Sequence, residues 1–293
     1  MPEAPILLPV EPAGLAARLP CPMSAHSIAH LGLVEDDAIL LDLAALELAA
    51  LDHPGVDLQP YRGFVDTLAD ELARHGRRAW GAEAQARVLA ELISGKHGFA
   101  GDATDYDHPD NSDLIRVVDR RRGLPVTLSI IYAAAARRIG WDADLLNTPG
   151  HVLVRVGPET SPVLIDPFNG GALLEGEGLA ELLARIFGPD VTPLPEHLEP
   201  MNNRAVLVRL LTNPASRALQ AGNTERALVL HARMTTVAPA IPSLWWERAR
   251  IELNLGDKDA AKASLASMLE VSRDPMLRAH VHATLDALAG SGR

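Results

Sequence analysis

The chain of 293 residues contains a single cysteine, Cys21, so no disulfide can form within it. Such usage of cysteine fits a reducing compartment. Aromatic residues are also scarce, at 4%, although hydrophobic residues reach 47%. A core with few aromatics and much alanine and leucine is typically helical, because both of these residues favour helices. The length suffices for one large domain or two ordinary ones.

Long apolar runs and an excess of positive charge are missing as well. No stretch is long and apolar enough to span a bilayer. The opening MPEAPILLPVEPAG has no positive leader of the kind that signal peptides carry, so we expect a cytoplasmic protein. The net charge of −11 disfavours general binding to nucleic acids, because an acidic surface repels phosphate. We expect no membrane partner and no resident cofactor.

Helical spacing of apolar residues organises the first part of the chain, after a proline-rich, irregular segment over 1–30. Asp36 or Asp37 is placed to cap the first helix, and Gly76 to end the second. Asn111 or Ser112 is placed to cap the fourth, which follows a loop rich in glycine and aspartate. The spacing predicts helices over 37–51, 61–72, 81–93 and about 113–120.

A further helix, over about 126–139, is apolar almost all round from Val126 to Ala136, which is typical of a buried helix. Pro125 suits its first turn, and Gly140 suits its end.

Two strand-like stretches follow, TPGHVLVRV over 148–156 and VLIDPFNGG over 163–171. A hairpin with a four-residue loop over 157–160 pairs Val156 with Ser161 and places His151 opposite Asp166 on one face. A histidine held by an aspartate usually serves a nucleophile, so His151 and Asp166 are the candidate catalytic pair.

The last third of the chain is helical and repetitive. Gly222 and Gly256 are 34 residues apart, and Ala227 and Ala261 share this offset. A 34-residue period of helix–turn–helix units is typical of tetratricopeptide repeats, with Trp245 at the early aromatic position. We expect units over 208–241 and 242–275, followed by a capping helix over 276–289. Two repeat units with a cap have only marginal stability alone. We therefore expect them to pack on the preceding domain.

The stretch NSDLIRVVDRRRGLPVTLSIIYAAAARRIGW…NTPGHVLVRV…LIDPFNGG resembles the SirB-type proteins. These bacterial proteins have a transglutaminase-like core followed by tetratricopeptide repeats. The resemblance implies an α+β fold with a small antiparallel sheet and a helical N-terminal part. The domains expected from it are an irregular segment over 1–30, a transglutaminase-like domain over 31–190, a linker over 191–207 and repeats over 208–293.

The wider superfamily uses a cysteine at a helix N-terminus, a histidine on one strand and an aspartate on the next. The resemblance assigns the last two roles to His151 and Asp166, but Pro125 occupies the position of the cysteine. Thr127 and Ser129, in the first turns of the same helix, are the alternative nucleophiles. They are also the kind of small residue that bonds to a preceding turn. Cys21 is distant in sequence and fits a bystander better.

Other polar residues allow two interpretations each. His26 and His30 share a spacing that metal sites use, but no third ligand stands nearby, so we expect no metal. Arg120 and Arg122, with Arg116 and the backbone near Gly123, suit an anion-binding patch. Surface ion pairs with Asp113 and Asp119 are the favoured interpretation of these arginines. Asn111, Arg120, Arg122 and Trp245 are the candidate binding residues.

Two functions remain open. The first is a scaffold or regulatory protein that binds a protein or peptide, through the repeats or the cleft near His151. The second is an amide-acting hydrolase or acyltransferase that uses His151 and Asp166 with an unidentified nucleophile.

Overall fold

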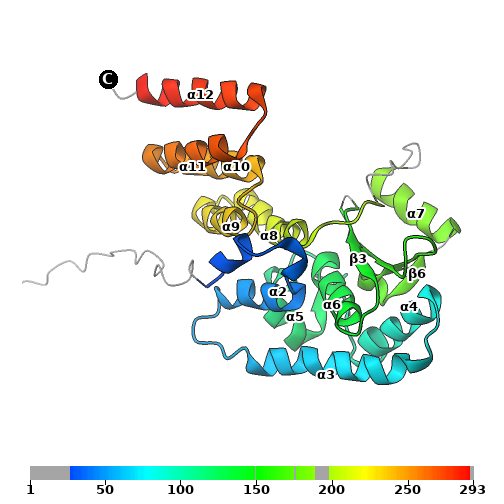
Figure 1. Ribbon diagram of the computed structural model, residues 1–293. Coiled ribbons are helices and arrows are strands. Elements are labelled where there is room, and N and C mark those ends of the chain that lie inside the picture. The colour runs from blue at the N-terminus through cyan, green and yellow to red at the C-terminus, as the bar shows by residue number, and fades with distance from the viewer. Residues whose placement is uncertain (1–26, 149, 175, 189–197, 291–293) are drawn as a thin grey trace, which may run out of the picture.

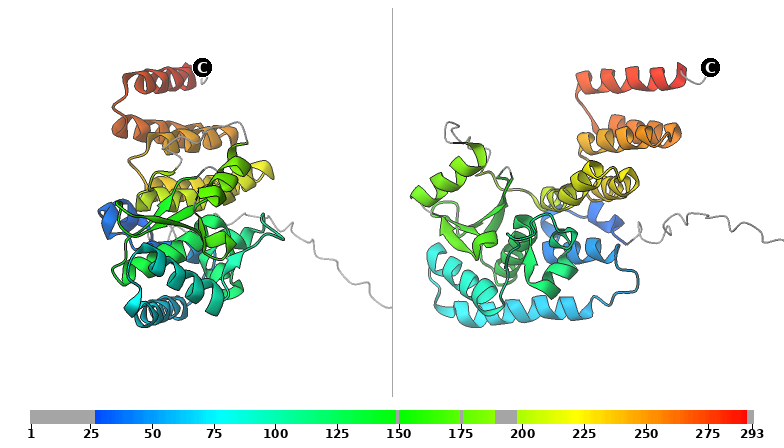
Figure 2. Two further views of the ribbon diagram at one scale, coloured as in Figure 1. Left: turned by 90° about the vertical axis from the view of Figure 1, so that its right-hand side faces the viewer. Right: turned by 180° about the vertical axis from the view of Figure 1, so that it is seen from behind.

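The computed structural model describes residues 27–148, 150–174, 176–188 and 198–290. A mainly helical body carries a small four-stranded sheet at one side and a stack of helices that rises from it (Figures 1 and 2). Cys21 and His26 lie outside the described residues. None of the helices in the described ranges is both long and apolar enough to cross a membrane.

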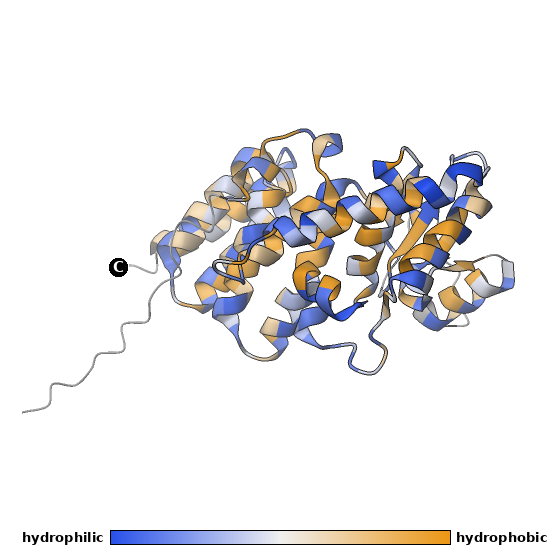
Figure 3. Ribbon diagram, turned by 90° about the horizontal axis from the view of Figure 1, so that it is seen from below, coloured by the Kyte–Doolittle hydropathy of each residue, from blue (hydrophilic) through white to orange (hydrophobic). Residues whose placement is uncertain are grey.

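Helix α6 (Pro125–Arg138) is the centre of this body. Its residues from Pro125 to Ala136 are all buried, as the apolar sequence predicts. Pro125 stands in the first turn, where its missing N–H costs nothing. Helices α2 (Leu41–Ala50) and α3 (Gln59–His75) pack on α6, and α5 (Leu114–Arg120) packs on α2. Seen from below, α3 turns largely hydrophilic residues outward (Figure 3).

Two of the expected helix caps are wrong. Residues Asp36–Ala38 form a separate 3-10 turn, so α2 begins only at Leu41 and has no side-chain cap. Asp36 instead accepts hydrogen bonds from the backbone N–H groups of Asn203 and Arg204, at 2.8 and 2.9 Å, and so caps a helix far along the chain. Helix α5 is capped by Asp113 rather than by Asn111 or Ser112.

The predicted third helix is present as α4 (Ala82–Ala90), which continues into a π-helical turn, η4 (Glu91–Lys96). Helix α3 ends at His75, next to the expected Gly76. The short strands β1 (Ala100–Gly101) and β2 (Arg122–Gly123) pair in parallel beside α5.

The four-stranded sheet is antiparallel in the order β3-β4-β5-β6. Its strands are β3 (Ala143–Leu146), β4 (Leu153–Val156), β5 (Val163–Asp166) and β6 (Ala172–Leu174). Helices α4 and α6 contact it on one side. On the other side, Leu182 of α7 (Gly176–Phe187) packs with sheet leucines such as Leu153.

The predicted hairpin register is wrong by two residues. Val156 pairs with Val163 rather than with Ser161, because the loop extends over 157–162. Pro162, just before β5, has no N–H to offer the ladder, so the hairpin cannot close tightly. Successive side chains alternate between faces, and a two-residue shift therefore keeps His151 and Asp166 on the same face.

The C-terminal helices form successive pairs. Gly222 (φ +73°) and Gly256 (φ +84°) hold equivalent turns, and the next residues, Asn223 and Asp257, cap the second helix of each pair. The 34-residue offset thus corresponds to equivalent positions in two helix pairs. The helices are α8 (Asn203–Gln220), α9 (Thr224–Val237), α10 (Pro242–Asn254), α11 (Lys258–Val271) and α12 (Pro275–Gly290).

The first helix pair shares the main hydrophobic core. Leu207 and Leu210 of α8 and Leu230 of α9 belong to the same buried cluster as residues of α2 and α6. The packing of the first C-terminal helix pair on the preceding part of the chain thus agrees with expectation, and the linker over 191–207 stays a prediction. Residues 203–207 already belong to α8, and residues 189–197 lie outside the described ranges.

Candidate functional site

His151 and Asp166 are brought together by the ends of two neighbouring strands. His151 precedes β4 and Asp166 ends β5, and the Nε2 of His151 lies 2.9 Å from the Oδ1 of Asp166. The same carboxylate caps the turn η6 (Pro167–Asn169) by accepting the N–H groups of Phe168 and Asn169. The amide Nδ2 of Asn169 donates to its Oδ2 at 2.6 Å. The histidine side chain is 12% exposed and that of the aspartate 1%.

The electrostatics of this pair favour an ionised aspartate. Burial raises the pKa of Asp166, but the hydrogen bonds from His151 and Asn169 outweigh it and lower the pKa below its usual value. Tyr132 of α6 lies nearby. Burial, together with the charge of Asp166, raises the pKa of its phenol. Its hydroxyl is buried and forms no hydrogen bond within the described part of the chain.

The two candidate hydroxyl nucleophiles are engaged elsewhere. The Oγ1 of Thr127 donates to the carbonyl of Asn111 at 2.7 Å, and the Oγ of Ser129 donates to the carbonyl of Val152 at 3.2 Å. Both side chains are fully buried. Neither hydroxyl bonds to His151, so both serve as ties between α6 and adjacent backbone.

A row of rings connects the acidic loop to this site. Phe168 contacts the His151 ring at a centroid distance of 6.1 Å and the Tyr106 ring at 5.7 Å. Gly101 allows the close approach, because an added Cβ would lie 2.5 Å from the Phe168 ring. Tyr106 of the loop 102–112 is thus connected to His151 through the Phe168 ring.

Arg120 and Arg122 both have partners within the protein. Arg120 pairs with the buried Asp102 at 3.1 Å and donates to the side chain of Asn111 at 3.1 Å. Its partner acid is thus Asp102 rather than the expected Asp113 or Asp119. Arg122 donates through Nη1 to the carbonyls of Gly98 and Arg121, both at 2.9 Å.

Asn111 itself has a structural role. It is fully buried, and its Nδ2 donates to the carbonyl of Asp105 at 2.8 Å. Its own carbonyl accepts from Leu124 and Thr127, which secures the start of α6.

Two remaining candidates also have local partners. The indole Nε1 of Trp245 donates to the carbonyl of Pro239 at 2.8 Å and so fastens the start of α10. His30 lies 3.3 Å from Glu47, and no group of three potential metal ligands occurs among the described residues.

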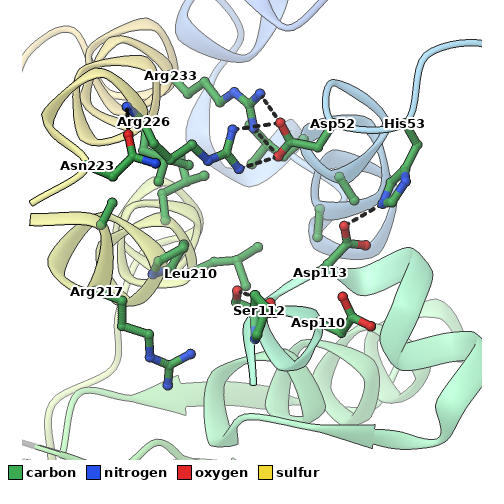
Figure 4. Close-up of a pocket in the computed structure, with 18 of the residues that line it drawn as sticks. Asp52, His53, Asp110, Ser112, Asp113, Leu210, Arg217, Asn223, Arg226 and Arg233 are labelled. Atoms are coloured by element: carbon green, nitrogen blue, oxygen red, sulfur yellow. Dashed lines mark hydrogen bonds and ion pairs between the residues drawn. The ribbon is translucent and has the colours of Figure 1, made fainter. Parts of the chain in front are cut away.

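A cavity of about 500 Å³ lies elsewhere, between α2, the segment 107–113 and the first C-terminal helix pair (Figure 4). Its apolar lining includes Leu48 of α2 and Leu210 and Pro214 of α8. Its charged lining includes Asp110 and Arg217. Ten of its twenty lining residues are polar or charged, so apolar walls and polar groups alternate around it. Ligand sites combine apolar surface with polar groups that fix the orientation of the ligand.

Ionic contacts that were not predicted from the sequence fix the walls of this cavity. Asp52 accepts paired hydrogen bonds at 2.7 Å from both Arg226 and Arg233, as Figure 4 shows. Burial raises the pKa of Asp52, but the two arginines outweigh it and hold the pKa well below its usual range. His53 lies 2.6 Å from Asp113. The seven-residue spacing of the arginines, which places them on one face of α9, was the available signal.

A comparison with protein-family models matches residues 59–212, just over half of the chain, to the transglutaminase-like superfamily. The chain belongs to the transglutaminase-like superfamily. The matched region runs from the start of α3 into α8, and it includes His151, Asp166 and Pro125.

The matches to several related proteins cover most of this chain. A UPF0162 protein of Xylella fastidiosa is 30% identical over 244 residues, which cover 82% of this chain and 87% of the relative. A UPF0162 protein of Pseudomonas aeruginosa is 28% identical over 246 residues, or 84% and 90%. A shorter match, 35% over 71 residues, links 24% of the chain to 11% of mouse F-box only protein 21.

The cavity lies at the boundary of the transglutaminase-like region. Residues 107–113 and the first half of α8 are inside the matched range, whereas Asp52, Arg226 and Arg233 are outside it. The cavity therefore depends on elements before and after the superfamily domain.

Proposed function

We propose that this chain is a transglutaminase-like protein of the SirB type that lacks a thiol nucleophile and works in the cytoplasm as a peptide- or protein-binding scaffold. The helix pairs α8–α9 and α10–α11 act in it as tetratricopeptide-type repeats. The observation that carries the proposal is the engagement of Thr127 and Ser129 with carbonyl groups, beside a proline at the start of α6. A histidine base without a nucleophile has nothing to activate.

The cavity beside α8 and α9 is the binding site in this proposal. Its walls come from three separate parts of the chain, and the four hydrogen bonds of Asp52 hold two of them together before a ligand arrives. A preorganised site loses less conformational entropy on binding. Its size suits one or two side chains of a peptide, with an apolar group against Leu210 and Pro214.

The test is a selection of peptides from a random library on the full chain, followed by affinity measurements on variants. Ala221 is exposed and lines the cavity, so Ala221→Trp fills the entrance without disturbing the core. Ala266→Trp places the same ring on an exposed position of α11, away from the cavity, and is the matched control. His151→Ala removes the imidazole.

We expect selected peptides to bind the wild type, Ala266→Trp and His151→Ala alike, and to lose affinity about tenfold or more for Ala221→Trp. The scaffold proposal fails if no peptide is retained, or if the loss occurs in His151→Ala instead.

The second candidate is an amide-acting hydrolase or acyltransferase, which the intact hydrogen bond between His151 and Asp166 favours. In this alternative the aspartate fixes the ring and the imidazole acts as a general base. Turnover of acyl or amide substrates that disappears in His151→Ala and falls in Asp166→Asn, with folding unchanged, would establish it. Equal turnover in wild type and variants eliminates it.

A further inference from the structure

The turn between α3 and α4 is basic and carries an exposed tryptophan. Arg77 and Arg78, in η3 (Gly76–Arg78), are exposed, and so is Arg74 in the last turn of α3. Trp80 follows with 86% of its surface exposed. Within the described ranges none of the three guanidinium groups reaches a carboxylate, and Arg74 donates only to the carbonyl of Asp70. This turn is therefore positively charged on a chain whose net charge is −11.

An acidic cavity of about 640 Å³ lies between the turn before α2, strand β3 and the loop between β4 and β5. Three of its lining acids, Asp37, Asp142 and Glu159, are exposed. Glu159 lies 3.6 Å from Arg155, and the other two have no cationic partner among the described residues.

The remaining two acids of this cavity are already engaged. Asp36 caps α8 through its bonds to Asn203 and Arg204. Asp144 bridges Arg137 and Arg155, at 3.1 and 2.7 Å. The unengaged charge of the cavity is therefore negative.

The basic turn and the acidic cavity are neighbours on one face of the molecule. Gly76 lies against Trp141, which lines the cavity, since an added Cβ would be 2.5 Å from the Cζ2 of this ring. Gly157, also in the lining, approaches Ala82 so closely that an added Cβ would be 2.4 Å from its Cβ. Packing thus joins both ends of the turn to the walls of the cavity.

We propose that this face is an interface between two copies of the chain, related by a twofold axis. Trp80 of each copy enters the acidic cavity of the other, and Arg77 and Arg78 meet Asp142 and Glu159. Because the two complementary patches lie side by side on one face, a single twofold operation makes the contact twice, as a closed dimer requires. Of the three exposed acids, Asp37 and Asp142 have no cationic partner among the described residues, and Glu159 has only Arg155 at 3.6 Å.

The charges also argue against other partners for the same turn. A nucleic acid or an anionic membrane attracted by the arginines would meet Asp37, Asp142 and Glu159 on the same face, and like charges repel. A second copy satisfies the basic and the acidic patch together. Exposed tryptophan and arginine are the residue types that most often dominate the binding energy of interfaces.

Sedimentation velocity of the full chain over a range of concentrations, at low and high salt, tests the interface. We expect a monomer–dimer equilibrium that weakens as salt rises. Trp80→Ala should weaken the dimer at least about tenfold. Met276→Ala removes a side chain that is also exposed, at 80%, on α12, and should leave the equilibrium unchanged.

Charge reversal makes the test specific. Arg78→Glu should weaken the dimer, whereas Arg273→Glu, with the same charge change at an exposed position after α11, should leave it intact. The double variants Arg77→Glu/Arg78→Glu and Asp142→Arg/Glu159→Arg should each fail to self-associate and should form a heterodimer when mixed. In the heterodimer both contacts join opposite charges, one as in the wild type and the other with the two signs exchanged. A monomer at every concentration in low salt overturns the proposal, as does a mixture of folded double variants that stays monomeric.

Discussion

Asp166 supports the polypeptide around it as well as the histidine. Its carboxylate accepts hydrogen bonds from two backbone N–H groups of η6 and from the side chain of Asn169, and it forms a hydrogen bond with the His151 ring. A carboxylate whose only task is to orient a base does not need to cap a turn. Asp166 therefore stabilises the local fold as well as holding the His151 ring.

The first prediction concerns Asp166→Ala. Loss of hydrogen bonds to a buried charge should lower the free energy of unfolding at neutral pH by about 2–4 kcal/mol. Since the pKa of Asp166 is lowered in the folded state, its contribution is complete above the unfolded pKa of about 3.9 and is lost as the pH falls through the folded pKa. Urea denaturation of both proteins across this range should show the difference shrinking in acid. A difference that stays constant with pH contradicts this assignment.

The second prediction compares two buried hydroxyls on α6. Tyr132→Phe removes a hydroxyl without a hydrogen-bond partner, so stability should stay within about 0.5 kcal/mol or rise. Thr127→Val removes the donor to the Asn111 carbonyl and should lower the free energy of unfolding by about 1–3 kcal/mol. Equilibrium unfolding by denaturant measures both. The opposite ranking would mean that the Tyr132 hydroxyl is engaged and that the tie to Asn111 is dispensable.

The sequence identified His151 and Asp166 as neighbours but not the residues of the cavity. The His–Asp pair is local, because 15 residues separate its members and one hairpin brings them together. Asp52 lies 174 residues from Arg226 and 181 from Arg233. Side-chain patterns within one segment carry no information about such distant partners.

At the scale of elements, the helices followed from local spacing, whereas their ends and the strand register depended on contacts elsewhere. Asp36 or Asp37 was expected to cap α2, but Asp36 accepts hydrogen bonds from free N–H groups at the start of α8. Pro162 lengthened the hairpin loop, and the alternation of side chains still preserved the face of His151.

The third prediction concerns the turns inside the two helix pairs. Gly222→Ala and Gly256→Ala should each lower the free energy of unfolding by about 1–2 kcal/mol. Both glycines have positive φ, a backbone conformation that is strained for an L-residue such as alanine. An added Cβ would meet nothing within 4 Å at either position, so the whole cost comes from the backbone.

Gly63→Ala is the matched control for these turns. Gly63 stands inside α3, also with open space around it, and alanine should stabilise that helix by about 0.5–1 kcal/mol. Thermal unfolding of the three variants gives the comparison. Changes of the same sign at all three positions would show that the turns do not require glycine.

At the scale of the whole molecule, Asp52 links α9 to the end of α2 across the cavity. The fourth prediction is that Asp52→Asn lowers the free energy of unfolding by about 2–3 kcal/mol and speeds hydrogen exchange in α9. The depressed pKa of Asp52 means that this contribution, too, is lost as the pH falls below its usual range. Asp259→Asn, which removes a 96% exposed acid 3.3 Å from Lys262, should change stability by less than about 1 kcal/mol. Equal effects of the two substitutions would contradict a linking role for Asp52.

In the proposed scaffold function, ligands bind at the junction of the superfamily domain and the first helix pair, and His151 and Asp166 have a structural role. The most direct test is hydrogen exchange of the full chain with and without a bound peptide. The account predicts new protection in 107–113 and in 214–226, around the cavity. Protection confined to 150–156 and 166–171, around His151, would contradict it and return the site to the His–Asp pair.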